Sequence, residues 1–154
     1  MPAAATRLSL ALLVAALVAG CGSSTPSVAP SATPTSDRLD GTTWALVSMD
    51  DQPVTLPAAD MVPTLAFAGG MASGNAGCNT FTGSYTVDGP SLTFGPLAST
   101  KKACVPEVGA VETAYLAALQ AVTAWAVPAD APMGTQLTLT GGGAKLVYAA
   151  PAGG

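Results

Sequence analysis

The residues of this chain that could do chemistry are three cysteines and nine carboxylates, and histidine is absent. Because Ser-His-Asp catalysis, Cys-His catalysis and His-ligated zinc sites all need an imidazole, these classes are excluded in their usual forms. What remains is sulfur chemistry at Cys21, Cys78 and Cys104 and acid–base chemistry at the carboxylates. No spacing among these groups resembles a metal cage or a cofactor site, so we expect neither a metal nor a cofactor.

Cys21 ends a segment that has the layout of a lipoprotein signal. Arg7 is followed by an apolar run over residues 8–18 and then by Ala19 and Gly20. A membrane-spanning helix needs about twenty apolar residues, so this shorter run predicts a cleaved signal peptide over residues 1–20. The tetrapeptide at 18–21 resembles a lipobox, which implies that the Cys21 Sγ receives a diacylglyceryl group. An ordinary secretory signal with a chance cysteine is the alternative.

The composition divides the rest of the chain into a linker and one domain. Residues 21–38 are mostly Ser, Thr, Pro, Ala and Gly, which predicts a lipid-anchored, flexible linker. Residues 39–151 are enough for one hydrophobic core. Two or more acyl chains hold a protein stably on a membrane. We therefore expect a membrane-anchored lipoprotein of the cell envelope, with its domain outside the cytoplasm.

Cys78 and Cys104 are the cysteines left once Cys21 is assigned to lipid. An even number of cysteines outside the cytoplasm predicts a disulfide bond. Closing a loop of about 27 residues corresponds to roughly 3.5 kcal/mol in the chain-entropy model. A redox-active or free thiol pair is the alternative, because Lys101 and Lys102 lie close to Cys104 in sequence.

The charge of the chain argues against nucleic acid as a partner. The formal net charge is −4, and it becomes more negative once Arg7 leaves with the signal. The remaining basic residues, which are Arg38, Lys101, Lys102 and Lys145, form no cluster, whereas nucleic-acid binding requires a basic footprint. The Lys101-Lys102 pair therefore indicates a solvated loop.

Short alternating segments dominate the domain. Apolar and polar residues alternate in runs bounded by Gly, Pro, Asp and Asn, which predicts antiparallel strands with one face in the core. These strands are expected at 43–49, 64–68, 71–75, 83–88, 91–94, 136–140 and 145–149.

One segment, residues 106–122, has helical periodicity instead. Its apolar residues recur at Val108, Val111, Tyr115 and Leu119, Pro106 suits the first helical position, and Glu107 suits the first turn. We predict one amphipathic helix packed on the sheet.

The same segments carry a resemblance to a known family. Their order and spacing resemble META-domain proteins, a group that includes the HslJ-like heat-shock lipoproteins. The matching motifs are Thr43-Trp44, Pro63 to Phe67, the signature Gly74-Asn75-Ala76-Gly77-Cys78-Asn79, Gly83-Ser84-Tyr85, Leu92-Thr93-Phe94, Leu97 to Thr100 with Cys104, Glu112 to Leu116 with Leu119, Leu137-Thr138-Leu139 and Leu146-Val147-Tyr148.

The resemblance implies a mainly β fold, in which a small antiparallel barrel-like or strongly curled sheet packs on one α-helix. It implies no established catalytic activity, and it associates the chain with envelope stress or antibiotic tolerance. The family often has a basic residue directly after Gly-Cys-Asn, whereas this chain has Thr80. Any role of that basic side chain is absent here.

Three functions follow as hypotheses. The first is a non-enzymatic binding or interaction module whose partner is an unknown envelope protein or small molecule, with no ligand-binding residue identified. The second is a small-molecule carrier lined by the aromatic residues Trp44, Phe67, Phe81, Phe94 and Trp125. The third is an enzyme with a carboxylate pair drawn from Asp50, Asp51, Asp60, Asp88, Glu107, Glu112 and Asp130, but the sequence gives no reason for two to converge, so we assign no catalytic residue.

Overall fold

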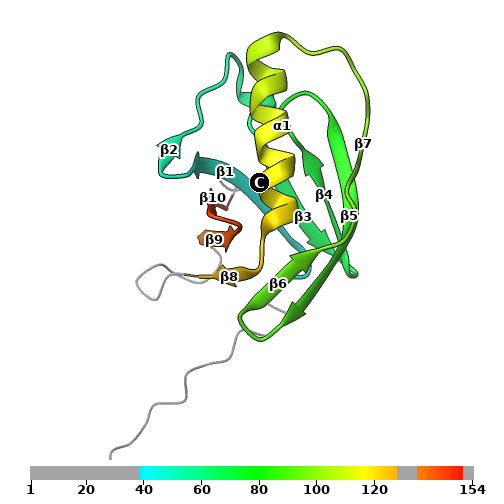
Figure 1. Ribbon diagram of the computed structural model, residues 1–154, viewed down its shortest axis with the longest axis vertical. Coiled ribbons are helices and arrows are strands. Elements are labelled where there is room, and N and C mark those ends of the chain that lie inside the picture. The colour runs from blue at the N-terminus through cyan, green and yellow to red at the C-terminus, as the bar shows by residue number, and fades with distance from the viewer. Residues whose placement is uncertain (1–38, 128–134, 151–154) are drawn as a thin grey trace, which may run out of the picture. The chain divides into compact units, whose positions relative to one another are not determined.

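The computed structural model describes residues 39–127 and 135–150 (Figure 1). The predicted signal peptide at 1–20, the predicted linker at 21–38 with its Cys21, and Asp130 lie outside the described residues. In the described ranges, no helix combines the length and apolar character needed to cross a membrane.

Eight antiparallel strands of the described part form a closed barrel, so the predicted fold class is confirmed. Neighbouring strands follow one another around the barrel in the order β1-β3-β4-β5-β6-β8-β9-β10, and β10 pairs back with β1. Their bounds are β1 Thr42–Met49, β3 Thr64–Ala68, β4 Met71–Asn75, β5 Thr80–Asp88, β6 Ser91–Phe94, β8 Ala124–Ala126, β9 Gln136–Gly141 and β10 Ala144–Ala149.

The closing pair β1–β10 contains a bulge. Leu46 pairs with Tyr148 and Ser48 pairs with Val147, so Val47 is the extra residue on β1. A bulge bends a strand and increases its twist, which helps the sheet to close on itself. Closure leaves the barrel strands without the free edges that invite association with other chains.

The single α-helix among the described residues, α1 (Pro106–Ala121), connects the two halves of the barrel. It follows β7 (Ala98–Ser99), which pairs with β5, and it leads directly into β8. Pro106 occupies the start of the helix and Glu107 its first turn, as the sequence predicts. Figure 1 shows α1 running between β1, β9 and β10 on one side and β3 to β6 on the other.

One apolar core fills the space between α1 and the sheet. The helix contributes Val108, Tyr115, Ala118 and Leu119, and every barrel strand contributes at least one buried side chain. The ring of Phe67 meets the Tyr85 ring edge-on at 4.8 Å and stacks on Phe94 at 6.2 Å. Such aromatic pairs add to the stabilisation gained from burial alone.

Two tyrosine hydroxyls meet at the centre of this core. The Tyr148 hydroxyl donates to the Tyr115 hydroxyl at 3.2 Å, and Tyr115 in turn donates to the carbonyl of Thr64 at 3.4 Å. Both side chains are fully buried, and burial raises the pKa of each phenol above its usual value. The chain of donors joins α1, β10 and the start of β3 through polar atoms inside an apolar region.

The predicted strands and the observed strands differ mainly at short elements. All seven predicted strands are present, and the helix is present with a difference of one residue at its end. The sequence prediction missed β8, the two-residue strands β2 (Gln52–Pro53) and β7, and the 3-10 helix η2 (Ala59–Met61). Two or three residues are too few for a periodic pattern, so contacts made in the folded chain specify these elements.

Candidate functional site

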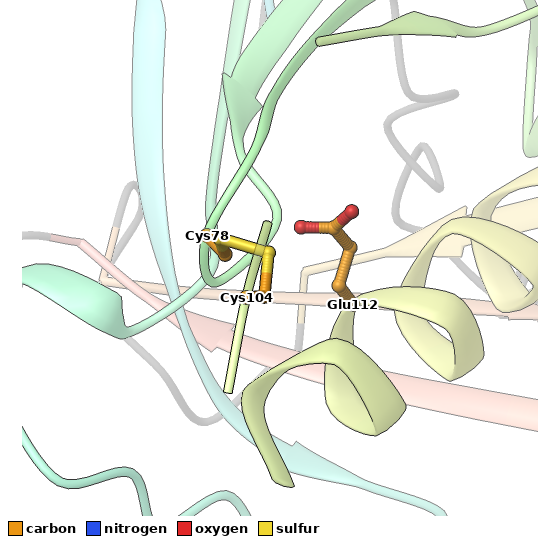
Figure 2. Close-up of side chains that lie close together, drawn as sticks. All are labelled: Cys78, Cys104 and Glu112. Atoms are coloured by element: carbon orange, nitrogen blue, oxygen red, sulfur yellow. A yellow bond between two sulfur atoms is a disulfide. The ribbon is translucent and has the colours of Figure 1, made fainter. Parts of the chain in front are cut away.

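A disulfide bond between Cys78 and Cys104 lies at the end of the barrel where α1 begins. The S–S distance is 2.05 Å and the two Cα atoms are 6.0 Å apart, as in an ordinary disulfide. The bond joins the turn between β4 and β5 to the segment that precedes α1 (Figure 2). These segments are otherwise 26 residues apart in sequence.

The glycines of the signature allow this turn to pack closely against its neighbours. Gly77 has φ +120°, a conformation that L side chains rarely adopt, and a Cβ there would lie 3.3 Å from the Val108 Cγ1. A Cβ at Gly74 would lie 2.0 Å from the carbonyl oxygen of Thr64, a distance that no side chain allows. The Asn75 Oδ1 accepts the Gly77 N–H at 2.7 Å and fixes the turn.

Apart from the aromatic residues of the core, Asn79 is the one buried residue with a polar side chain in the described part of the chain, and it is 3% exposed. Its Oδ1 accepts the Thr100 hydroxyl and the Lys102 N–H, both at 2.7 Å. Its Nδ2 donates to the Glu112 Oε1 at 2.9 Å, and its backbone N–H donates to the Glu112 Oε2 at 2.7 Å. The amide is thereby satisfied on both sides, as a buried polar group must be to avoid a large desolvation cost.

Glu112 connects this network to the helix. Its half-buried carboxylate extends from α1 toward the disulfide (Figure 2). Both of its oxygens accept hydrogen bonds from Asn79. The sequence offered Glu112 as one of seven candidate carboxylates for an enzyme. In the structure it holds the backbone and the side chain of Asn79.

The same region holds the one cluster of potential metal ligands among the described residues. One ligand atom from each of Cys78, Cys104 and Glu112 lies within 4.8 Å of the other two. While the two sulfurs are bonded to each other, neither is a thiolate, so the cluster cannot act as a thiolate site in this state.

A surface cleft of about 410 Å³ opens beside the disulfide. Asp60 and Lys102 give it charges of opposite sign, and the half-exposed Val105 lies in its wall. Its lining comes from η2, the β4–β5 turn and the segment leading into α1, and consists of Asp60, Met61, Asn75, Gly77, Cys78, Lys102, Ala103, Cys104, Val105 and Val108. A smaller hollow of about 280 Å³ lies over β5 and β7.

The other residues considered from the sequence lie outside this cleft. Asp50 and Asp51 form the turn after β1, where the Asp50 Oδ1 accepts the Lys145 N–H and Asp51 pairs with the Lys145 ammonium. No carboxylate of the described residues is fully buried, so none forms a buried pair. The aromatic residues of the carrier hypothesis belong to the core or pack against it, and these are Trp44, Phe67, Phe81, Phe94 and Trp125.

A comparison with protein families decides what kind of domain this is. The family model for the META domain matches residues 37–152. The chain belongs to the META domain family. No curated protein matches it.

Solved structures agree with this assignment. An NMR structure of a protein from Burkholderia xenovorans is 31% identical, with a TM-score of 0.63, over 84% of this chain and 96% of that one. A second NMR structure is 26% identical with a TM-score of 0.61, over 76% and 95% of the two chains. The crystal structure of a DUF4847 family protein from Bacteroides vulgatus, at 16% identity and a TM-score of 0.50 over 73% and 94%, shares the fold alone.

Within this META domain, the sequence prediction missed three contributors to the site. It identified the cysteines and Glu112 but gave no role to Asn79, Thr100 or the backbone of Lys102, which complete the network. Asn79 directly follows a cysteine in a glycine-rich turn, so its position in the signature was the available signal. Thr80, which replaces the basic residue frequent in the family, is exposed and pairs with Thr100 through its backbone.

Proposed function

We propose that this META domain protein is a non-enzymatic, lipid-anchored module of the cell envelope that binds a partner in the cleft beside the disulfide. The observation that carries the proposal is the way the cleft is built. Two of its walls are tied to each other by the Cys78–Cys104 bond, and the Asn79 network ties both to α1. A preformed site loses little conformational entropy when it binds, so this rigidity favours affinity.

The lining of the cleft suggests the chemistry of the partner. Met61 and Val105 offer apolar surface, while Asp60 and Lys102 offer one negative and one positive group. A protein segment with an apolar side chain between charges of both signs matches this lining. We therefore propose an envelope protein as the partner.

Anchoring at Cys21 completes the proposal. The apolar run at 8–18, the small residues before Cys21 and the linker composition at 21–38 support a lipidated N-terminus on a flexible tether. A tether of this kind presents the cleft near the membrane surface while leaving the domain free to reorient. A role in envelope stress or antibiotic tolerance would follow from the partner that the cleft recruits.

The absence of an enzymatic role is part of the proposal. Glu112 is the half-buried carboxylate near the cleft, and both of its oxygens accept hydrogen bonds from Asn79. This structural role holds the β4–β5 turn to α1 and accounts for the position of Glu112 without catalysis.

Site-specific photo-cross-linking in membranes tests the cleft. A photoreactive residue replaces Val105, which is 55% exposed in the cleft wall, or Val47, which is 50% exposed on β1 outside the cleft. We expect a discrete cross-linked partner at position 105 and none at 47. Lys102→Glu should reduce the cross-link, whereas Lys101→Glu, beside it but outside the cleft lining, should not. Equal products at both positions, or none at 105, would contradict the proposal.

The anchor is tested separately by fractionation. We expect the wild-type chain in the membrane fraction with the mass of an acylated, cleaved protein, and the Cys21→Ala chain released from it. A wild-type chain of unmodified mass would contradict the lipid anchor and leave the cleft proposal to the cross-linking result.

A further inference from the structure

We propose that reduction of the disulfide converts Cys78, Cys104 and Glu112 into a binding site for a thiophilic divalent cation such as zinc. The inference rests on the three ligand atoms that lie within 4.8 Å of one another, and it is independent of what the cleft binds. Figure 2 shows the Glu112 carboxylate directed from α1 toward the pair of sulfurs.

The geometry is close to what a tetrahedral zinc site needs. With Zn–S distances of about 2.3 Å, two coordinating sulfurs lie about 3.8 Å apart, and a carboxylate oxygen binds at about 2.0 Å. The two cysteine Cα atoms are 6.0 Å apart, so rotation of the two side chains can bring both sulfurs onto one ion. Two thiolates and one carboxylate leave the fourth position to water.

Asn79 supplies the outer contacts that orient the ligands. Its backbone N–H and its amide hold the two Glu112 oxygens, and each oxygen keeps a lone pair for a metal. Its Nδ2 is also 3.4 Å from the Cys104 Sγ, close enough to donate to a thiolate. Hydrogen bonds of this kind fix ligand orientation and contribute strongly to metal affinity.

The site is open to solvent. Cys78, Cys104 and Glu112 are all partly exposed, and both cysteines line the 410 Å³ cleft. A reductant and a hydrated cation can therefore reach the sulfurs without unfolding of the domain.

A dithiol can serve as the reductant of the Cys78–Cys104 disulfide. The dithiol transfers two electrons and two protons to the S–S bond and becomes a disulfide itself, which leaves Cys78 and Cys104 as thiols. The cation then displaces both thiol protons and binds the carboxylate, so two protons are released per ion. Because the same two sulfurs make either the disulfide or the metal bonds, the two states exclude each other.

The consequence is that one cross-link replaces another. The disulfide holds the β4–β5 turn to the segment before α1, and the metal would hold the same two segments and add α1 through Glu112. The domain would then keep its structure at this end whether the two sulfurs are oxidised or reduced.

Cobalt titration tests the proposal on the full chain carrying Cys21→Ala, so that Cys78 and Cys104 are its two thiols. The chain is reduced with a phosphine, desalted without oxygen and titrated with Co²⁺, which absorbs in the near ultraviolet when it binds thiolate. We expect one Co²⁺ per reduced chain, displacement by Zn²⁺, and no thiolate band in the oxidised chain. The absence of stoichiometric binding to the reduced chain would overturn the proposal.

The contribution of Glu112 to metal affinity distinguishes a three-ligand site from binding by the two thiols alone. Glu112→Gln should weaken Zn²⁺ binding at least tenfold, while Glu107→Gln, an exposed change in the same helix, should leave it unchanged. Equal affinity in the two variants would overturn the proposal. Because Glu112→Gln also disturbs Asn79, X-ray absorption of the zinc-loaded wild-type chain gives a second test. Two sulfurs with light-atom ligands are expected, and four sulfurs would overturn it.

Far-UV circular dichroism shows whether the metal binds a folded chain. The reduced, zinc-loaded chain should keep the spectrum of the oxidised chain. An unfolded spectrum with zinc bound would assign the binding to free thiols and overturn the proposal.

Discussion

The helix α1 packs against two regions that are held together in different ways. Around Tyr115 and Leu119, the helix meets the sheet through apolar side chains, with two tyrosine hydroxyls as the polar exception. Around Glu112, it meets the β4–β5 turn through a buried amide, a carboxylate and a neighbouring disulfide. The stability of the first region depends on the volume of its side chains. The stability of the second depends on which atoms donate and which accept hydrogen bonds.

This difference teaches where substitutions are tolerated. Cores accept exchanges that conserve volume, because dispersion and hydrophobic burial are not directional. A satisfied polar network does not accept exchanges that conserve volume alone, because replacing a donor with an acceptor leaves a buried group unpaired. Isosteric changes should therefore be mild in the apolar region and severe at the disulfide end.

The largest effect is expected from a cavity in the apolar region. Phe67→Ala removes a side chain that is 1% exposed and contacts the rings of Tyr85 and Phe94. We expect a loss of about 4 kcal/mol in the free energy of unfolding, measured by urea denaturation. Phe67→Leu, which keeps much of the volume, should cost less than half as much. Equal losses in the two variants would contradict a core that depends on volume.

Removing the covalent bond should have the next largest effect. The double change Cys78→Ala and Cys104→Ala opens a loop whose ends are 26 positions apart in sequence, for which the chain-entropy model gives a loss of about 3.5 kcal/mol. Urea denaturation of the double variant and of the oxidised wild type measures it. A wild type reduced without metal should match the variant, and a difference of several kcal/mol between them would show that the cysteines contribute by other means.

The buried amide at the disulfide end is tested by an isosteric change. Asn79→Asp keeps the shape but replaces the Nδ2 donor with an acceptor beside the Glu112 Oε1. We expect a loss of about 2 to 3 kcal/mol in the free energy of unfolding at pH 7, because a donor is lost and two carboxylates face each other. Chemical denaturation at pH 7 and at pH 4 measures it. The loss should shrink at pH 4, where protonation relieves the repulsion, and a loss independent of pH would contradict this reason.

The difference between the two regions also explains which parts of the fold the sequence could predict. Strands such as Thr64–Ala68 and Met71–Asn75 alternate strictly or are bounded by turn glycines, so their periodicity locates them without tertiary information. The helix is located equally well, since Val108, Tyr115 and Leu119 recur at helical spacing on its buried face. Barrel closure was expected from the family resemblance alone, because pairing of β1 with β10 joins segments about a hundred residues apart.

The candidate site was only partly predictable. The cysteine count predicts the Cys78–Cys104 pair, but a hydrogen-bond network formed by residues 79, 100, 102 and 112 has no periodic signal, since its members meet only in the folded chain. The cleft depends in addition on η2, a single turn whose position is set by contacts such as the Asn75 Nδ2 bond to the carbonyl of Asp60. The atoms that distinguish the disulfide end were therefore the hardest to foresee.

The smallest effect is expected at the pair of tyrosine hydroxyls inside the apolar region. Tyr148→Phe removes one hydroxyl of the Tyr115–Tyr148 pair and should cost about 1 kcal/mol at pH 7. Because burial raises the pKa of both phenols, the unfolded chain loses phenolic protons near pH 10 while the folded chain keeps them. Stability should thus be full below about pH 10 and fall above it by about 1.4 kcal/mol per pH unit for each tyrosine.

The free energy of unfolding of Tyr148→Phe should therefore fall less steeply with pH than that of the wild type, by the contribution of one tyrosine. Urea unfolding between pH 9 and pH 11 measures both slopes. All other titratable groups are the same in both proteins, so their effect cancels in the difference between the two slopes. Identical slopes would show that the Tyr148 phenol does not stay protonated in the folded state. The centre of the core would then tolerate charge, and the contrast between the apolar region and the disulfide region would lose its physical basis.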